Sequence, residues 1–592
     1  MEKTYRTKPD NAILRQLFKK AELSYAVSDF SKVIGPIVDL MFISIFIGPA
    51  GVTVMGYVSP LIALLGLIGS NISSGSRNKV SALLGAGKIE EANSIFSASV
   101  VLGGGLSLIA SLGVLLFCSG VSSILGANEP QIFEMTKLYI FGYMIGVPFV
   151  TLSRVLTPYL QMEGQYRRIS AVSMLTTAID IAADAFVVFV LHGGMFEIAL
   201  ATSLGNIVPF FAGAAFFFQG KSHSVFRFSL KGISPKLCGE IMRLGAPSGI
   251  FMGSNAVGGM LINNMLTGFN MRYLVAAYGV FSQITVFVRS SWYAPSDTLL
   301  AFSGIFIGEE DRNSLKELQK IALTQALIYT SAVTAFLFAF AAQTAGIFLK
   351  SNDPEALRIC VECIRVACLS LPFYAIVYNF NYYLMAVKRL RFSNLYSFLI
   401  ECGNIVPITF IMLQAISYSG AWVSKVMNMV LLSLLAAFYI YRHQEGATYR
   451  DKMLLMPDSF GIAPENEIAV AATSADEILD LSRLAVAFAL EHGAGKNRAR
   501  TFGLVTEELA LVLKEHGFSD GGPHHINARL VAKGEELIIR MRDDCRLFNL
   551  TEYYQRVRED HEKGVGLSII MKKSKSVQYT NTLGANNLIV RI

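Results

Sequence analysis

Residues 29–49 read DFSKVIGPIVDLMFISIFIGP, an apolar stretch of the length that a membrane-spanning helix needs. Comparable stretches recur from this point to about residue 440. Of the 592 residues, 53% are hydrophobic and only 16% are charged. This composition and the recurring stretches predict a polytopic membrane protein.

The apolar stretches predict about twelve spanning helices in two lobes of six. The first lobe is assigned to residues 29–220, with spans near 29–49, 54–74, 93–118, 136–159, 168–192 and 196–219. The second lobe is assigned to residues 221–440, with spans near 240–267, 273–305, 319–349, 361–387, 393–414 and 418–440. Residues 1–28 are polar and basic, show no cleavable signal, and are expected to form a cytoplasmic N-terminal segment.

An internal repeat supports this division. The order Pro148–Phe149, Tyr159–Leu160, Arg167–Arg168 returns at a constant offset as Pro372–Phe373, Tyr383–Leu384, Arg391. Gly85, after the second span, corresponds in the same way to Gly308, after the eighth. Two six-helix halves related by a parallel repeat are typical of secondary transporters.

Basic residues are distributed unequally between alternate loops, which predicts the orientation in the membrane. One set of loops and flanks is rich in Lys and Arg, whereas the alternate loops hold only Lys137, Arg272, Lys350 and Arg358. The basic side is cytoplasmic by this rule, so an even number of spans places both termini in the cytoplasm. A multi-pass protein of the bacterial inner membrane is expected, and the net charge of +7 is attributed to the membrane surface and not to nucleic acid.

The chain changes character after residue 440. Residues 441–468 contain two prolines and are expected to be a linker, and residues 469–592 read as a soluble domain. Helical spacing covers 475–492 and 502–515, and strand-like alternation covers 525–531, 537–542 and 587–592. These patterns predict a cytoplasmic α+β domain.

Three carboxylates lie inside the predicted spans of the first lobe, where ionisable groups are costly and usually functional. Asp39 is in the first span, and Asp180 and Asp184 share one face of the fifth because they are four residues apart. Carboxylates buried together can bind a hard cation or hold a proton. The alternative is helix capping or pairing with an intramembrane base such as Arg154.

The second lobe is less acidic at the repeat-related positions, where Asn404 stands opposite Asp180 and Ile408 opposite Asp184. Ion coupling is therefore expected in the first lobe. Other charged residues near or within spans are assigned equally to cavity lining or to ion pairs and interface contacts: Arg289, Asp297, Glu401 and Lys425.

Residues 25–440 resemble the multidrug and toxic compound extrusion (MATE) family. The segments that carry the resemblance are 37–39 (IVD), 47–50 (IGPA), 84–92 (LGAGKIEEA), 180–184 (DIAAD) and 199–202 (ALAT). The resemblance implies antiport, in which sodium ions or protons enter while an amphipathic or cationic compound leaves, with no cofactor required for transport. It also implies an ion site at Asp39, Asp180, Asp184 and Thr202, although the family pattern has Asn where this chain has Asp180.

The C-terminal domain resembles the histidine-kinase-like ATPase fold of the anti-sigma-factor serine kinases. The corresponding segments are 505–509 (VTEEL), 543–548 (DDCRLF), 563–567 (KGVGL) and the closing 587–590 (NLIV). The resemblance implies ATP binding with Glu508, Asp543, Gly564 and Gly566 at the nucleotide. Val512 replaces the metal-binding Asn and Cys545 replaces a Gly, so a domain without kinase chemistry that binds a nucleotide or a cytoplasmic regulatory protein is expected.

The leading interpretation is a cation-coupled exporter of small molecules that carries a regulatory tail and is not an enzyme. Two other classes stay open. A lipid-linked precursor flippase would have a broad basic cavity and extra terminal helices, which are not apparent in the sequence. A membrane signalling protein would use the transporter-like half as a sensor. A cassette ATPase is excluded because the chain has no GxxxxGK[ST] loop.

Overall fold

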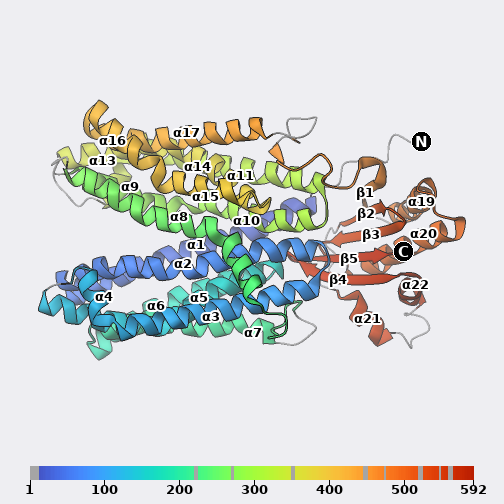
Figure 1. Ribbon diagram of the computed structural model, residues 1–592, viewed down its shortest axis with the longest axis horizontal. Coiled ribbons are helices and arrows are strands. Elements are labelled where there is room, and N and C mark those ends of the chain that lie inside the picture. The colour runs from blue at the N-terminus through green and yellow to red at the C-terminus, as the bar shows by residue number, and fades with distance from the viewer. Residues whose placement is uncertain are drawn as a thin grey trace.

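The computed structural model describes residues 12–127, 129–218, 224–268, 273–348, 354–443, 451, 453–472, 475–517, 525–545, 548–557 and 565–592. Two bundles of long helices lie side by side, and a smaller domain built around a β-sheet lies at one end of them (Figure 1). The described chain thus has the predicted helical two-lobe architecture followed by an α+β domain.

The first lobe is built by residues up to Phe218. Its elements are α1 (Ala12–Phe42), η1 (Ile43–Ile47), α2 (Pro49–Gly85), α3 (Ile89–Leu116), α4 (Cys118–Ile124), α5 (Pro130–Met162), α6 (Tyr166–Phe186), η2 (Val187–Leu191) and α7 (Met195–Phe218). The segments η1 and η2 are π-helical and directly extend α1 and α6. Single π turns of this kind often mark functional sites.

The second lobe is more interrupted than the sequence predicts. Its elements are α8 (Pro235–Gly268), α9 (Leu274–Val288), α10 (Ser290–Gly308), α11 (Arg312–Ala339), α12 (Ala341–Phe348), α13 (Pro354–Ala367), η3 (Cys368–Ser370), α14 (Leu371–Ala386), α15 (Leu390–Phe398), η4 (Leu399–Gly403), α16 (Ile405–Ile416), η5 (Ser417–Ser419) and α17 (Gly420–Arg442). The single span expected at 273–305 is two helices that meet at Arg289.

Within the described residues, nine helical stretches are long and apolar enough to cross a membrane. One of them, Leu390–Arg442, contains two of the predicted spans. The two predicted spans that this criterion does not count coincide with α8 and with the α9–α10 pair. Every predicted span therefore lies on helix.

The N-terminal segment differs from the prediction, because α1 begins at Ala12, well before residue 29. Its early turns place Ile13, Leu17 and Phe18 on one buried face, and the Phe18 ring packs edge-on against Phe302 of α10 at 5.8 Å. The apolar residues of this segment recur at helical spacing, which indicates a helix. They cover only one face, so the segment lacks the continuous apolar run that predicts a membrane span. Residues 12–28 thus belong to the first helix of the lobe.

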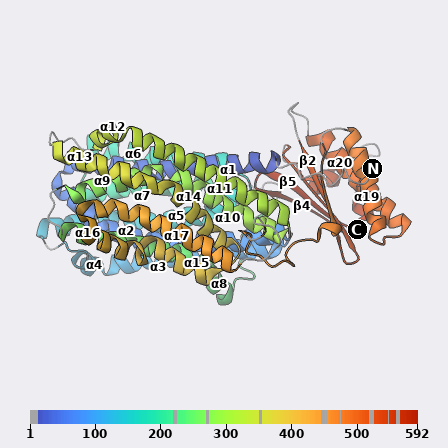
Figure 2. The ribbon, with the colours of Figure 1, turned by 90° about the horizontal axis from the view of Figure 1, so that it is seen from above.

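The two lobes touch closely where α2 meets α10. A Cβ on Gly85 would lie 2.1 Å from the carbonyl oxygen of Ile305, and a Cβ on Gly308 would lie 2.0 Å from that of Ala82. The two repeat-related glycines therefore permit reciprocal backbone contact. This contact closes the bundle at the end that carries the tail (Figures 1 and 2).

The tail contains a five-stranded antiparallel sheet in the order β1-β2-β3-β5-β4. Its elements are η6 (Pro464–Asn466), β1 (Glu467–Ala472), α19 (Ala475–Glu491), α20 (Lys496–Gly517), β2 (Ile526–Lys533), β3 (Glu536–Asp543), α21 (Leu550–Val557), α22 (Val565–Lys573), β4 (Ser576–Thr582) and β5 (Ala585–Arg591). The five strand and helix predictions for this domain lie on α19, α20, β2, β3 and β5. Strands β1 and β4 were not predicted, and β1 starts two residues before the expected boundary at 469.

The sheet has two chemically different faces because side chains alternate along each strand. In β2, Ala528 and Leu530 join the apolar core beneath α19 and α20, whereas Arg529 and Lys533 point to the helical bundle. Figure 2 shows the sheet lying between the bundle and the tail helices. The tail therefore presents a basic sheet face to the helical bundle.

That basic face meets the loop that follows α10. Arg529 donates to the carbonyl oxygens of Glu309 and Glu310 at 3.0 Å, and Arg542 bonds the Glu309 carboxylate at 2.6 Å. Lys533 pairs with the Glu310 carboxylate at 2.8 Å. These contacts fix the tail to the second lobe.

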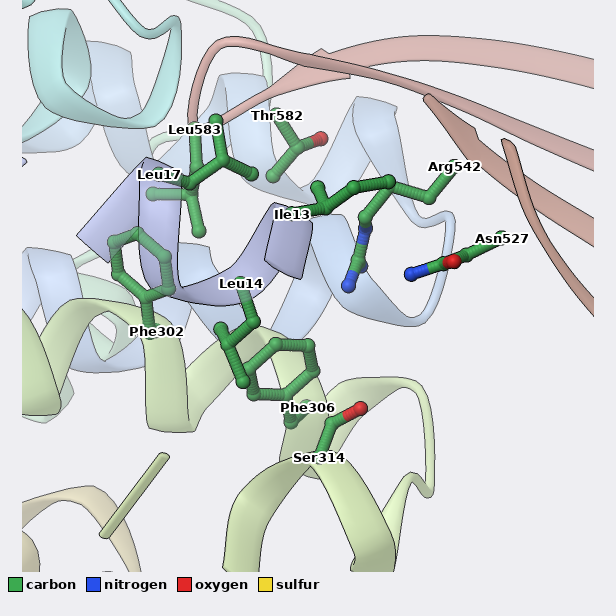
Figure 3. Close-up of a pocket in the computed structure, with 10 residues that line it drawn as sticks. All are labelled: Ile13, Leu14, Leu17, Phe302, Phe306, Ser314, Asn527, Arg542, Thr582 and Leu583. Atoms are coloured by element: carbon green, nitrogen blue, oxygen red, sulfur yellow. The ribbon is translucent and has the colours of Figure 1, made fainter. Parts of the chain in front are cut away.

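The same sheet also contacts the first lobe. Arg540 donates to the Gly85 carbonyl at 3.2 Å, and the backbone N–H of Leu583, in the β4–β5 turn, donates to the Met162 carbonyl at 2.6 Å. Tyr166 donates its hydroxyl to the Leu583 carbonyl at 3.1 Å. In Figure 3, Leu583 and Arg542 lie over α1 and α10 side chains around a small pocket. One sheet thus bridges both lobes.

Candidate ion-coupling site and central cavity

The four residues predicted to form an ion site come together in the first lobe. Asp39 is on α1, Asp180 and Asp184 are on α6, and Thr202 is on α7. Asp39, Asp180 and Asp184 are 5%, 6% and 0% exposed. Both acidic helices continue directly into π-helical turns, η1 and η2, just beyond these carboxylates.

The carboxyl groups occupy two contacts. Asp39 faces Asp184, and Asp180 lies against the hydroxyl of Thr202. Several of these buried oxygens nevertheless accept no hydrogen bond. Within the described residues, Oδ1 of Asp39, Oδ1 of Asp180 and both carboxylate oxygens of Asp184 have no donor. Buried oxygens without donors carry a large desolvation cost, which a proton or a cation would offset.

Two glycines allow Asp180 to sit between its neighbours. A Cβ on Gly35 of α1 would lie 2.9 Å from Oδ2 of Asp180, and a Cβ on Gly205 of α7 would lie 3.1 Å from its Cβ. Helices α1 and α7 therefore approach the carboxylate more closely than larger residues would permit. Among the described residues, no three His, Cys, Asp or Glu side chains converge in a preformed metal site.

Sequence reasoning missed two tyrosines beside this site. Tyr139 of α5 lies within electrostatic range of Asp39, Asp180 and Asp184, and its ring stacks on Tyr143 at 6.0 Å. Tyr139 is 2% exposed. Their spacing of four residues places both on one helix face, but aromatic residues at that spacing are common in apolar cores and gave no specific signal.

Among the described residues of the second lobe, the positions related by the repeat to Asp180 and Asp184 carry no carboxylate. Asn404 donates to the side-chain oxygen of Asn428 at 2.6 Å, and Ile408 is buried. The nearby Glu401, in the π-helical segment η4, accepts from Asn255 at 2.6 Å and from Tyr378 at 2.8 Å. The two lobes are therefore chemically unequal.

A cavity of about 730 Å³ lies between the lobes. Its walls come from α1, α2 and α5 of the first lobe and from α8, α9, α10, α14 and α17 of the second. A volume of this size suits a small organic molecule. Since α2 and α10 are in contact at the tail end, the cavity is closed on the side where the tail docks.

Ion pairs between the lobes cross this cavity. Arg289, at the α9–α10 junction, binds Asp29 of α1 through two bonds of 2.9 and 2.7 Å. Arg77 of α2 pairs with Asp297 of α10. Arg289, Asp297, Glu401 and Lys425 thus line the cavity and also have partners, so both roles considered from the sequence apply.

The tail residues predicted at a nucleotide are only partly brought together. Asp543 is fully buried and accepts from Asn586 at 2.6 Å and from the Cys545 N–H at 3.1 Å. Burial raises its pKa to about 6. Val512 lies in the tail core, and Gly564 lies outside the described residues.

Glu508 contacts the start of α22 instead of open space. A Cβ on Gly566 would lie 2.1 Å from Oε2 of Glu508, so the carboxylate rests against this glycine. A helix start of this kind favours negative charge. Here the chain's own carboxylate occupies the position that the resemblance assigns to the nucleotide phosphate side.

Comparisons with known proteins match the helical part of this chain to MATE proteins. The profile of the MatE family matches residues 25–186. The multidrug export protein MepA of Staphylococcus haemolyticus is 24% identical over 431 residues, which cover 71% of this chain and 91% of that protein. MepA of Staphylococcus aureus strain MSSA476 is 24% identical over 447 residues, or 72% of this chain and 95% of that protein.

Solved structures share the fold of the helical part. The Vibrio cholerae MATE transporter VcmN superimposes with a TM-score of 0.68 at 16% identity, covering 72% of this chain and 96% of that one. A transporter from Pyrococcus furiosus, described as having a binding pocket of reverse polarity, superimposes with a TM-score of 0.66 at 17% identity, covering 74% and 96%.

Proposed function

We propose that the membrane part of this chain is a MATE-type secondary transporter, not an enzyme, which exports small amphipathic compounds in exchange for sodium ions or protons. The observation that carries the proposal is the buried set of Asp39, Asp180 and Asp184, in which Oδ1 of each residue and Oδ2 of Asp184 have no donor among the described residues. These carboxylates lie in the lobe that also lines the central cavity. The protein is proposed to work in the bacterial inner membrane with both termini in the cytoplasm.

Helix α1 connects the ion site to the cavity. It carries Asp39 at the ion site and, about three turns earlier, Asp29, which pairs with Arg289 of the second lobe. A cation or proton that neutralises the Asp39–Asp184 pair removes the repulsion between α1 and α6. We infer that the resulting movement of α1 loosens the Asp29–Arg289 pair and lets the lobes separate.

The test is counter-transport in proteoliposomes that contain the full chain. A substrate gradient set up across the membrane should drive the coupling ion in the opposite direction, and sodium and proton gradients should be imposed separately. Asp39→Asn and Asp184→Asn should each abolish gradient-driven export while leaving substrate binding measurable. Asp480→Asn, on the exposed surface of tail helix α19, is the control and should transport normally.

The ion that drives export identifies the coupling ion. A contact between two carboxyl groups favours a shared proton, so we expect proton-driven exchange to be faster than sodium-driven exchange. Export that continues at the wild-type rate in both Asn variants would refute the proposed coupling site.

We also propose that the tail regulates transport by holding the cytoplasmic ends of the lobes together. The support is the sheet's simultaneous attachment to Gly85 and Met162 of the first lobe and to Glu309 and Glu310 of the second. Alternating access separates the lobes around the central site. The sheet would therefore have to release one lobe before the cavity opens to the cytoplasm.

Nucleotide or partner binding by the tail stays a prediction at Glu508, Asp543, Gly564 and Gly566. A cytoplasmic protein that binds the sheet face would compete directly with the lobes, so release of the tail would also be the point of control in the sensor-like alternative. Flippase activity is the second candidate function because the cavity is basic. Within the described chain, the last membrane helix before the tail is α17.

A further inference from the structure

The charges on the cavity wall do not balance. The basic side chains that line it are Lys32, Arg77, Arg154, Arg289 and Lys425. The acidic ones are Asp29, Asp297 and Glu401. Two of the bases, Arg77 and Arg289, are paired with Asp297 and Asp29, so the remaining imbalance lies with the other three.

Lys32 and Arg154 form a cationic wall on the first lobe. Arg154 of α5 donates to the Gly66 carbonyl at 3.1 Å, and neither it nor Lys32 of α1 has a carboxylate within ion-pair distance in the described chain. Lys32 is exposed to the cavity and lies in electrostatic range of Asp29, which Arg289 already binds, and of the two bases Arg154 and Arg289. Like charges held together in an apolar protein repel one another, and a ligand anion placed between them relieves that repulsion.

The opposite wall is aromatic and comes from the second lobe. Trp292 and Tyr374 have ring centroids 4.9 Å apart, and Tyr293 and Tyr378 have centroids 5.1 Å apart. These tilted rings offer an apolar aromatic surface together with hydroxyl and indole donors. An organic body placed between the two walls would contact aromatic rings on one side and the two bases on the other.

An aromatic wall could also bind a cation, but the chain already supplies one. The Lys425 ammonium lies 4.3 Å from the centroid of Tyr278 and 5.5 Å from that of Phe281. The one cavity carboxylate outside an ion pair, Glu401, accepts bonds from Asn255 and Tyr378. A substrate cation would therefore compete with an internal ammonium and meet two further unpaired bases.

We propose that the central cavity selects amphipathic organic anions, with the anionic group between Lys32 and Arg154 and a planar apolar body against Trp292 and Tyr378. This inference deepens the proposed export function and rests on it for the direction of transport. It replaces the cationic part of the substrate class that the family resemblance implies. The shared chemistry is an acidic group joined to an apolar body, whether the molecule is soluble or a membrane lipid.

The first test is equilibrium binding to the purified full chain in neutral detergent, which does not depend on transport. Two xanthene dyes of similar size are compared by fluorescence anisotropy: carboxyfluorescein, an anion, and rhodamine 123, a cation. The anion should bind at least about tenfold more tightly, the value of one charge-assisted contact. Tighter binding of rhodamine 123 would overturn the inference.

Variants locate the anion. Lys32→Gln and Arg154→Gln should each weaken carboxyfluorescein binding by about tenfold and leave rhodamine 123 binding unchanged or tighter. Lys32→Arg keeps the charge and should retain the anion, which separates a charge effect from misfolding. Arg167→Gln, an exposed arginine on α6, is the matched control and should bind like wild type. Equal losses for both dyes in the Gln variants would contradict a charge-specific site.

Two further arms separate the possible sources and the two proposals. Competition by phosphatidylglycerol in mixed micelles identifies a lipid head group as the anion, and competition by a soluble aromatic carboxylate identifies a free compound. In proteoliposomes, anion binding without ion-driven movement would refute the proposed export while the cavity assignment stands. Ion-driven movement of rhodamine 123 but not of carboxyfluorescein would refute the cavity assignment while export stands.

Discussion

The role of each charged residue in this protein depends on the residue that it contacts on a neighbouring helix. Asp29 and Asp39 lie on the same helix, yet Asp29 is matched by Arg289 and Asp39 faces another carboxyl group. The first arrangement holds the lobes together, and the second leaves a site that a cation or proton can neutralise. Residue type alone does not distinguish the two roles.

Asp29→Asn should destabilise the contact between the lobes. It removes the charge that Arg289 binds through two hydrogen bonds and leaves a guanidinium with no carboxylate partner. Loss of a charge-assisted bond costs about 1–3 kcal/mol. Thermal unfolding of the full chain in detergent should show a lower midpoint, and the double variant Asp29→Asn/Arg289→Gln should recover part of the loss. A double variant that is less stable than the sum of both single variants would contradict the pairing.

Asp543 should make the tail less stable as the pH rises. Its folded pKa of about 6 is above the usual unfolded value of about 3.9, so the folded state binds more protons between these pH values. Its contribution is fully present below about pH 4 and is lost as the pH rises through about 6, by at most about 3 kcal/mol. Hydrogen exchange of β3 peptides in the full chain measures this.

Asp543→Asn is the comparison, because Asn has no proton to lose. The stability difference between wild type and variant should change between pH 4 and 6 and be constant above about pH 7. A difference that is independent of pH would show that the carboxyl group is already ionised throughout this range.

At the scale of single elements, close backbone contact between α2 and α10 determines which end of the bundle is closed. Gly85 and Gly308 lie at the C-terminal ends of these helices and each rests on a carbonyl of the other helix. Their repeat-related positions make the contact reciprocal. A side chain at either position cannot be accommodated while the helices remain in place.

Gly308→Ala should therefore open the end of the bundle that carries the tail. Its Cβ would lie 2.0 Å from the Ala82 carbonyl oxygen, so α2 and α10 must move apart. Distances between spin labels on the C-terminal ends of α2 and α10 should increase, and the rate of exchange should fall. Gly253→Ala on α8 is the matched control because its Cβ would meet nothing within 4 Å. Unchanged label distances in Gly308→Ala would contradict this account of closure.

The whole molecule is organised by one sheet that contacts both lobes. Its core face is covered by α19 and α20, and its basic face meets the acidic loop Glu309–Asp311. Opposite charges at this contact stabilise the docked arrangement. The tail is thus attached to both lobes at once.

Reversing one charge at this contact should release the tail. In the wild type, Arg542 donates a 2.6 Å hydrogen bond to the Glu309 carboxylate. Arg542→Glu replaces this bond by two carboxylates that repel each other. We expect faster hydrogen exchange in the β2–β3 region and a faster rate of transport. The double variant Arg542→Glu/Glu309→Arg should restore the wild-type values.

Arg556→Glu, an exposed position on α21, controls for the change in net charge. If release of the tail, measured by exchange, leaves the rate of transport unchanged, the tail does not regulate the lobes.

The sequence by itself was enough to predict a polytopic membrane protein with two lobes, carboxylates inside the spans of the first lobe, and an α+β tail. Each of these depends on local patterns: apolar length, period-2 and period-3.6 spacing, and ionisable residues inside spans. Three features were missed: the start of α1, the break at Arg289 and the position of Tyr139 beside the ion site. Their local patterns look like a polar tail, a continuous span and core packing, respectively.

Only the tertiary structure decided how charges are matched. Arg289 and Asp29 are 260 positions apart in the chain and bind each other, while Lys32 and Arg154 line the same cavity and form no ion pair within the described chain. The docking of the sheet on both lobes likewise joins segments from opposite ends of the chain. Pairing depends on which helices and strands face one another, and that is a property of packing between distant segments, which no local pattern encodes.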